Sequence, residues 1–336
     1  MSISKEIAGQ TKVVSLARPQ SLSLDALKPI LPALLLAALV IIFQTLPNAQ
    51  PLEDTAKFLF LALVASGLYL AWWIASYFIQ SQQEKLYHVL PKLIAGLVLL
   101  NLWELLTLKF NVFPLPYFPS ASKVVSVLFS DWKLLGISTL YSLRLLALGY
   151  GIGVLAGIPT GIAMGWYQRA NYWLNPILRV IGPIPSTAWI PIAMVIFPTS
   201  FTASVFLIAL GTWFPVTVMT WSGIANVNKS YFEVARTLGG SEWYLIRRVA
   251  LPAALPLIFI GLFMGLGVSF VTLVVGEMLG VKAGLGWYIQ WAQGWAEYAK
   301  VYASLLVMAL LFSGIITLVF RLRDRILVWQ KGLIKW

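Results

Sequence analysis

The sequence predicts an all-α polytopic membrane protein, and three observations lead to that fold class. Hydrophobic residues make up 60% of the 336 residues, charged residues make up only 11%, and the mean hydropathy is +0.84. A soluble core cannot absorb that balance. Apolar runs of about 20 residues, long enough to cross a bilayer, recur throughout the chain. We expect membrane spans at residues 29–47, 57–80, 92–109, 137–165, 178–198, 201–222, 253–279 and 301–320.

These spans divide the chain into three parts. Residues 1–28 lack the layout of a signal peptide, because no small-residue cleavage site follows a short apolar run, and we expect a cytoplasmic tail there. Residues 29–90 carry two spans that we interpret as accessory transmembrane helices, either a brace against lipid and the next span or a docking element. Residues 91–336 carry the remaining six spans.

The composition argues against several other classes of protein. The chain has no cysteine, so disulfides and thiolate metal sites are excluded. Its one histidine, His88, and its scattered acids offer little to an intramembrane enzyme, so we expect no catalytic residue and no metal site. A net charge of +12 would suggest nucleic acid in a soluble protein. Here membrane topology and contact with lipid explain the basic residues, and we expect no nucleic-acid partner.

Lysine and arginine predict the orientation of the spans, because cytoplasmic segments carry an excess of both. With the N-terminus inside, the outer segments contain only Lys57, Lys109, Lys123, Lys133, Lys282 and Lys300. The inner segments contain Lys5, Lys12, Arg18, Lys28, Lys85, Lys92, Arg169, Arg179, Lys229, Arg236, Arg247, Arg248, Arg321, Arg323, Arg325, Lys331 and Lys335. We therefore expect both termini and the segment 223–252 in the cytoplasm.

The most informative stretch is 233–252, a polar, arginine-bearing segment between two strongly apolar runs. Good helix formers precede Gly239 and Gly240, where the backbone can adopt a positive φ. Ser241 is a candidate N-cap for a second short helix, and Pro252 lies where a new membrane helix would begin. The alternative is an ordinary helical hairpin between two spans.

The order of residues in this stretch is similar to the EAA loop of permease subunits from ABC importers. The consensus is EAA, three residues, Gly, nine residues and Ile-x-Leu-Pro; Val234 and Val249 are the only departures. The resemblance implies a type I importer permease fold for residues 91–336. It also implies a coupling helix that docks into a groove on the ATPase subunit. The residues carried over to that role are Glu233, Ala235, Arg236, Gly239, Leu251 and Pro252.

Two outer connections bear features of their own. After the prolines at 114, 116 and 119, residues from Ser120 onward could form a short amphipathic helix at the membrane surface. In importers of this type such outer elements help to receive the loaded binding protein. The second connection, 280–300, contains Gly-Leu-Gly-Trp at 284–287, similar to an element of nitrate, sulfonate and taurine permeases. Its tryptophans are equally typical of an interfacial aromatic belt.

The span 178–198 is a candidate for the translocation path. Pro183, Pro185 and Pro191 cannot all lie in a regular helix, and unsatisfied backbone within a bilayer is tolerated only beside protein or a water-filled cavity. Freed backbone groups and the hydroxyls of Ser186 and Thr187 could therefore line a path. The alternative is a packing kink that accommodates Trp189; the resemblance favours the path.

Charges within apolar spans are costly and are usually paired or functional. Three ionisable residues lie there: Glu104, Arg144 and Glu277. Arg144 and Glu277 are included among the candidates for the translocation path, since Arg144 could attract an anionic solute. A tightly held anion would be hard to release, however, and we expect an Arg144–Glu277 ion pair rather than direct contact with solute.

Glycines repeat at mostly four-residue spacing in the span 137–165. Such stripes let membrane helices pack tightly, and we expect packing here, with a sliding surface during gating as the alternative. They lie at positions 149, 151, 153, 157, 161 and 165.

The chain has no G-x-x-x-x-G-K-[ST] phosphate loop, so we expect ATP and magnesium to bind to separate ATPase subunits. One coupling loop per chain implies a second permease copy, most simply as a homodimer. The resemblance adds an outer solute-binding protein or lipoprotein, a prokaryotic plasma membrane, and a small anion of the nitrate, bicarbonate or sulfonate and taurine class. The segment 324–336 leans toward nitrate and bicarbonate members.

The alternative function is a gradient-driven secondary transporter or channel. That function predicts matching broken spans in inverted repeats, and the sequence has one proline-broken span.

Overall fold

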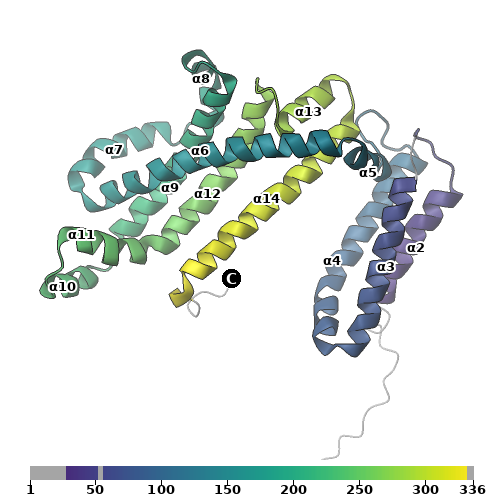
Figure 1. Ribbon diagram of the computed structural model, residues 1–336, viewed down its shortest axis with the longest axis horizontal. Helices are drawn as coiled ribbons and strands as arrows, with labels where there is room; N and C mark the ends of the chain where they lie inside the picture. The colour runs from purple at the N-terminus through teal and green to yellow at the C-terminus, as the bar shows by residue number, and fades with distance from the viewer. Residues whose placement is uncertain (1–27, 52–55, 331–336) are drawn as a thin grey trace, which may run out of the picture. The chain divides into compact units, whose positions relative to one another are not determined.

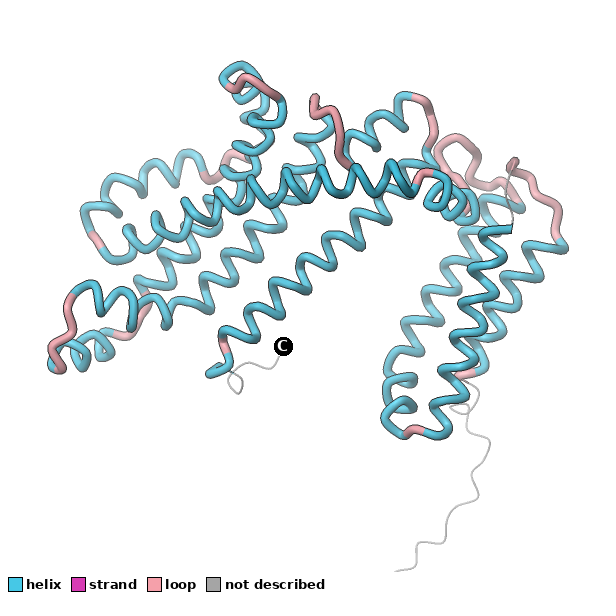
Figure 2. The backbone as a smooth tube through the Cα atoms, viewed as in Figure 1, coloured by secondary structure: helices cyan, strands magenta, loops and turns pink. Residues whose placement is uncertain are grey.

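The computed structural model describes residues 28–51 and 56–330, and every regular element in that part of the chain is a helix (Figure 2). The expected tail up to residue 27 and the end of the chain from 331 lie outside the described residues. Contacts divide the chain into two compact units, with the boundary between Val112 and Phe113. The helix over our expected span 92–109 therefore belongs to the same unit as the two helices before it.

The first unit is a three-helix bundle. It contains α2 (Ile30–Thr45), α3 (Ala56–Phe78) and α4 (Gln80–Glu104), which continues as the π-helical segment η1 (Leu105–Lys109). Its core consists of Leu36, Tyr69, Leu86 and Leu90. The Lys109 ammonium donates to the carbonyls of Phe43 and Leu46, at 3.0 and 2.6 Å, at the C-terminal end of α2. Those carbonyls have no partner within the helix, so the lysine caps them.

The second unit carries ten α-helices among its described residues (Figure 1). They are α5 (Ala121–Ser130), α6 (Trp132–Trp166), α7 (Gln168–Ile181), α8 (Ile190–Ile196), α9 (Ser200–Ala225), α10 (Lys229–Thr237), α11 (Glu242–Tyr244), α12 (Leu251–Met278), α13 (Leu285–Gly294) and α14 (Tyr298–Ile326). The short helix expected after Pro119 is confirmed as α5, and Ser120 caps it by accepting from the Lys123 amide at 3.3 Å.

The glycine stripe of α6 packs against α9, as expected. Five glycines of α6 lie against α9, and a Cβ atom at each would lie within 3 Å of the side chain 59 positions later. The pairs are Gly149–Ile208, Gly153–Thr212, Gly157–Val216, Gly161–Thr220 and Gly165–Ile224. Gly151 lies off this stripe, with nothing near its missing Cβ. Because the pair numbers rise together, α6 and α9 run parallel, in backbone contact along their length.

Helix α9 packs equally closely on α12, but antiparallel. A Cβ at Gly261 of α12 would lie 2.8 Å from Met219 Cβ. The hydroxyls of Thr212 and Ser269 hydrogen-bond at 2.6 Å, so the α9–α12 interface also has a buried polar contact. The three helices α6, α9 and α12 form the layer that supports the rest of the unit.

Six helices in the described residues are long and apolar enough to cross a membrane, or seven if one bent pair counts as a span. The bent pair is the proline-rich segment: α7 ends at Ile181, and the helical stretch Ser186–Ile196 departs at 85°. The regular helix is broken, as the prolines predict. Helix α7 also begins at Gln168, ten residues before our expected span. Helix α2, with 16 residues, is shorter than these spans.

Candidate functional site

The segment expected to couple to an ATPase folds as two short helices joined by a tight turn. Asn228 caps α10 by accepting from the Ser230 amide at 3.0 Å. At the other end, the Gly240 amide donates to Ala235 O and the Gly239 amide to Arg236 O, both at 2.9 Å. With Gly239 at φ +81°, these two bonds make a complete Schellman motif, which a residue with a Cβ adopts only with strain.

The next helix begins as the sequence predicts. Ser241 accepts a hydrogen bond from the Tyr244 amide at 3.3 Å, which caps α11. The chain then continues without interruption through the π-helical segment η3 (Leu245–Ala250) into α12, where Pro252 occupies the first turn. Glu242–Met278 is thus one helical stretch of 37 residues that starts in this loop.

One face of this loop is anchored and the other is open. Phe232 packs edge-on against Trp166, with ring centroids 5.4 Å apart, and Leu245 and Ile246 are buried. Opposite this anchor, five large apolar side chains are exposed, with Leu238 83% exposed; they are Tyr231, Val234, Leu238, Trp243 and Tyr244. Four of them, all except Trp243, line one groove, and exposed apolar side chains gathered in this way are typical of an interaction surface.

A groove of about 700 Å³ follows this face. Ala235 and Gly239 line it, Glu233 and Arg236 are exposed on α10 beside it, and Leu251 and Pro252 lie half-buried at the start of α12. We call the segment from Tyr231 to Val249 the coupling loop hereafter.

The candidates in the broken span line a second groove, of about 620 Å³. Pro183, Pro185, Ser186 and Thr187 form one wall, and residues of α9 and α12 form the other. The groove has no charged side chain in its lining. The Ser186 hydroxyl bonds to that of Thr272 on α12 at 2.7 Å, so the broken span is attached to the α9–α12 layer.

Arg144 and Glu277 do not line this groove, and the ion pair expected between them is absent from the described residues. The expectation was wrong because of where the two side chains lie around α6. Ser142, two residues before Arg144, faces Glu277, and residues two apart point to different sides of a helix. Arg144 is exposed, and its guanidinium lies over the Phe201 ring, 5.2 Å from the centroid.

Glu277 has other partners, which sequence reasoning missed. One carboxylate oxygen accepts from the Ser142 hydroxyl at 2.7 Å, and the other accepts from the Gly286 amide at 2.8 Å. Gly286 belongs to α13, a helix in the connection 280–300 that was not expected to be helical. The Gly-Leu-Gly-Trp sequence at 284–287 was the signal that could have revealed it, because Gly284 is the N-cap of α13.

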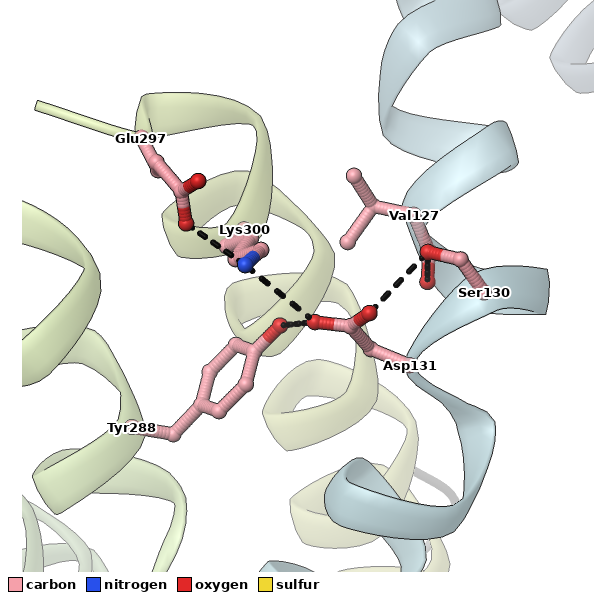
Figure 3. Close-up of polar contacts among 6 residues, drawn as sticks. All are labelled: Val127, Ser130, Asp131, Tyr288, Glu297 and Lys300. Carbon is pink, nitrogen blue, oxygen red and sulfur yellow. Dashed lines mark hydrogen bonds and ion pairs between the residues drawn. The ribbon is translucent and has the colours of Figure 1, made fainter. Parts of the chain in front are cut away.

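A second polar cluster connects α13 to its neighbours. The Tyr288 hydroxyl donates to Asp131 Oδ2 at 2.7 Å, and the Lys300 ammonium lies 2.6 Å from Glu297 Oε2 and 3.7 Å from Asp131 Oδ2 (Figure 3). Burial, together with the bond to Asp131, raises the pKa of the Tyr288 phenol, so Tyr288 stays protonated and remains the donor. Asp131 joins α5 to α6, and Lys300 lies in the first turn of α14.

Comparison with known proteins agrees with this geometry. The family model "Binding-protein-dependent transport system inner membrane component" matches residues 151–327, more than half of the chain and all within the second unit. The bicarbonate transport system permease protein of Synechococcus elongatus is 36% identical over 123 residues, 37% of this chain and 44% of that protein. The nitrate import permease protein of Leptolyngbya laminosa is 32% identical over 187 residues, 51% of this chain and 64% of that protein. The chain thus aligns with less than two thirds of either relative.

Among solved structures, the MetNI methionine ABC transporter in an inward-facing conformation matches with a TM-score of 0.51 and 19% identity, covering 59% of this chain and 98% of that chain. At this identity the likeness is one of fold. The all-α architecture is therefore that of a type I importer permease, with additional helices before it. The chain belongs to the family of binding-protein-dependent transport system inner membrane components.

Proposed function

We propose that this chain is the transmembrane permease subunit of an ABC importer for a small anion. The observation that carries the proposal is the coupling loop. A capped helix, a Schellman turn and a second helix present an apolar face and a groove of about 700 Å³, and they continue into a membrane-spanning helix. A loop that served only as a helical hairpin would have no need of this exposed apolar surface.

The partner at this surface is a separate ABC ATPase subunit, which binds the ATP and magnesium that the transport cycle consumes. The chain itself is not an enzyme. The sequence supports this division, since it contains no phosphate-binding loop. Glu233, Ala235, Arg236 and Gly239 make the contact, with Leu251 and Pro252 connecting it to α12.

The complete importer contains two further components. One is a second copy of this chain, because one coupling loop per chain would serve one of two ATPases. The other is an outer solute-binding protein or lipoprotein. The family match supports a prokaryotic plasma membrane protein. The excess of lysine and arginine in the inner segments supports both termini in the cytoplasm.

The solute class is nitrate, bicarbonate, or sulfonate and taurine. Relatives named for bicarbonate and nitrate transport support it. The path runs along the uncharged groove formed by Pro183, Pro185, Ser186 and Thr187, where hydroxyls and freed backbone groups offer weak contacts. A path without fixed charge suits an anion that must leave as readily as it enters.

In the transport cycle, ATP-driven closure of the two ATPases displaces the coupling loops. The permease pair then changes between inward-facing and outward-facing states. The alternative is a gradient-driven transporter or channel. Uptake that follows an ion gradient and continues without ATP would favour it.

The test is purification of the tagged chain from its native host in mild detergent. We expect about one ATPase chain per permease chain. Gly239→Asp places a charge on the docking face, where a Cβ meets open space, and should reduce ATPase recovery about tenfold or more while leaving membrane insertion intact.

The matched control is Gly239→Asn, because asparagine tolerates a positive φ and carries no charge. It should retain most of the ATPase. Recovery of the wild-type chain alone in several detergents, or full transport by Gly239→Asp, would contradict the proposed function.

A further inference from the structure

Glu277 holds the start of α13 against two other helices. Its side chain is 1% exposed, and its two oxygens accept from Ser142 Oγ and from the Gly286 amide. The Ser142 hydroxyl oxygen in turn accepts from the Leu285 amide at 2.9 Å. The amides of the first turn of a helix have no partner within the helix, and a negative charge is favourable there. We call Ser142, Glu277, Leu285 and Gly286 the Glu277 cluster.

The two glycines of this segment allow the carboxylate to approach. A Cβ atom at Gly284, where φ is +136°, would lie 2.4 Å from Glu277 Cδ. A Cβ atom at Gly286 would lie 2.6 Å from Val274 O and 2.9 Å from Glu277 Cβ. Both positions therefore require glycine. A side chain at Gly284 would collide with Glu277, and one at Gly286 would collide with Glu277 and with the backbone of α12. The Glu277 carboxylate is thus enclosed by residues of its own chain and is not accessible to solute.

Apart from its bonds to Glu277 and Ser142, α13 is attached to the helices around it by further contacts. Tyr288, which is 0% exposed, bonds to Asp131 at the junction of α5 and α6. The Ser304 hydroxyl of α14 donates to Leu285 O at 3.3 Å. Leu285, Tyr288 and Ile289 also share a buried core with residues of α6 and α14. A displacement of the start of α13 must therefore displace these contacts as well.

Glu277 is the last residue but one of α12, so it lies at the opposite end of that helix from the coupling loop. Figure 1 shows α11 and α13 at these two ends of α12. The continuous helix Glu242–Met278 has 37 residues, so it extends over roughly 55 Å at 1.5 Å per residue. Its interior contacts with α9 are close, and its two ends carry the coupling loop and the Glu277 cluster.

We propose that Glu277 is a positioning residue that transmits displacement of the coupling loop to the other face of the permease. The loop moves α12, and the Glu277 cluster makes α13 follow, together with the contacts of α13 to α5, α6 and α14. That face is where the solute-binding protein docks under the proposed function, on which this inference rests. Glu277 acts through α13 and does not contact the solute.

The test uses the complete importer, with its ATPase and binding protein, in lipid nanodiscs and proteoliposomes. The readout is the ratio of ATP hydrolysis with solute-loaded binding protein to hydrolysis without it, together with uptake per ATP. Glu277→Ala leaves the Gly286 amide and the Ser142 hydroxyl without their acceptor. We expect the ratio to fall toward one, with a smaller fall for Ser142→Ala.

Two variants separate transmission from loss of stability. Glu277→Gln keeps an acceptor for the Gly286 amide and offers an amide to Ser142, so it should restore most of the ratio. Thr139→Val removes a hydroxyl of α6 whose bond, at 2.7 Å, is to Leu135 O of the same helix, and it should leave the ratio unchanged. Melting temperature in detergent is measured for every variant.

A wild-type ratio in both Glu277→Ala and Ser142→Ala would overturn the inference and leave the proposed function standing. So would losses of basal and stimulated hydrolysis that are equal and follow the melting temperature. A wild-type chain that associates with no ATPase would overturn the proposed function and the inference together.

Discussion

Gly153 of α6 shows how little space some positions of the second unit leave for a side chain. A Cβ atom there would lie 2.5 Å from Thr212 Cβ and 2.7 Å from Ala209 O, and a backbone oxygen cannot move aside as a flexible side chain can. Gly151, two residues earlier on the same helix, has nothing within 4 Å of its Cβ position. The two positions form an internal comparison within one helix.

We predict that Gly153→Ala destabilises the α6–α9 pair by about 1–3 kcal/mol, the usual cost of overpacking. Gly151→Ala should be neutral or slightly stabilising, since alanine is the better helix former. The measurement is the apparent melting temperature of each variant by fluorescence-detected gel filtration. Equal melting temperatures for the two variants would contradict the close approach of α6 and α9.

Single residues also show which features of the site could be predicted from the sequence and which could not. Ser241 as an N-cap and Gly239 at positive φ could be predicted, because both follow from local backbone rules. The partner of Glu277 could not. Its direction around α12 depends on tertiary packing, and its acceptor bonds run to an amide and a hydroxyl rather than to the charge of Arg144.

At the scale of elements, the broken span is the least regular part of the unit. Its prolines end α7 and leave a short stretch that attaches to α12 only through a few contacts, such as the Ser186–Thr272 bond. The break was predictable, because proline cannot continue a helix. The 85° bend was not, since it depends on how α9 and α12 support the returning chain. Helix α13 was also missed, because its ten residues are too few for a clear periodicity.

We predict that Gly267→Leu obstructs the groove and lowers uptake several-fold. Gly267 lines the groove, and a Cβ there meets nothing within 4 Å, so the larger side chain extends into the cavity rather than into a neighbour. Gly314→Leu on α14, also at an open position outside the groove, is the control and should retain uptake. ATPase recovery is measured in parallel and should be unchanged in both variants. Normal uptake by Gly267→Leu would exclude the groove as the path.

At the scale of the molecule, the division after Val112 separates the three-helix bundle from the unit that contains the whole family match. A helix lies at each of the eight spans that the sequence predicted, but only six of them, or seven with the bent pair, are long and apolar enough to cross a membrane, and α4 and α7 begin 12 and 10 residues before the expected spans. The sequence could not show which helices share a core, because membrane spans are apolar on every side and hydrophobicity does not distinguish the face that packs against another helix. The role of the first unit stays a prediction: a brace or a docking element.

The orientation can be tested on the intact molecule, because the chain has no cysteine of its own. Leu238, 83% exposed in the coupling loop, and Trp295, 71% exposed after α13, lie beyond opposite ends of α12. With the coupling loop in the cytoplasm, a membrane-impermeant thiol reagent applied to whole cells should label Trp295→Cys and spare Leu238→Cys. The chain is expressed without an ATPase, so that the docking face of the coupling loop stays uncovered, and permeabilised cells should then label both. The reverse pattern in intact cells would invert the topology.

The constant separation of 59 positions between α6 and α9 has an evolutionary consequence. One inserted residue between Gly149 and Gly165 would turn the rest of the glycine stripe by about 100° and place side chains against a backbone that has no space for them. An insertion between Trp166 and Ser200 changes only the number of positions between the paired residues, and it leaves the contacting faces of α6 and α9 in register. Length differences that arise during divergence should therefore accumulate in the segment between α6 and α9, part of which lines the uncharged groove. That segment can therefore change in length while α6 and α9 keep theirs.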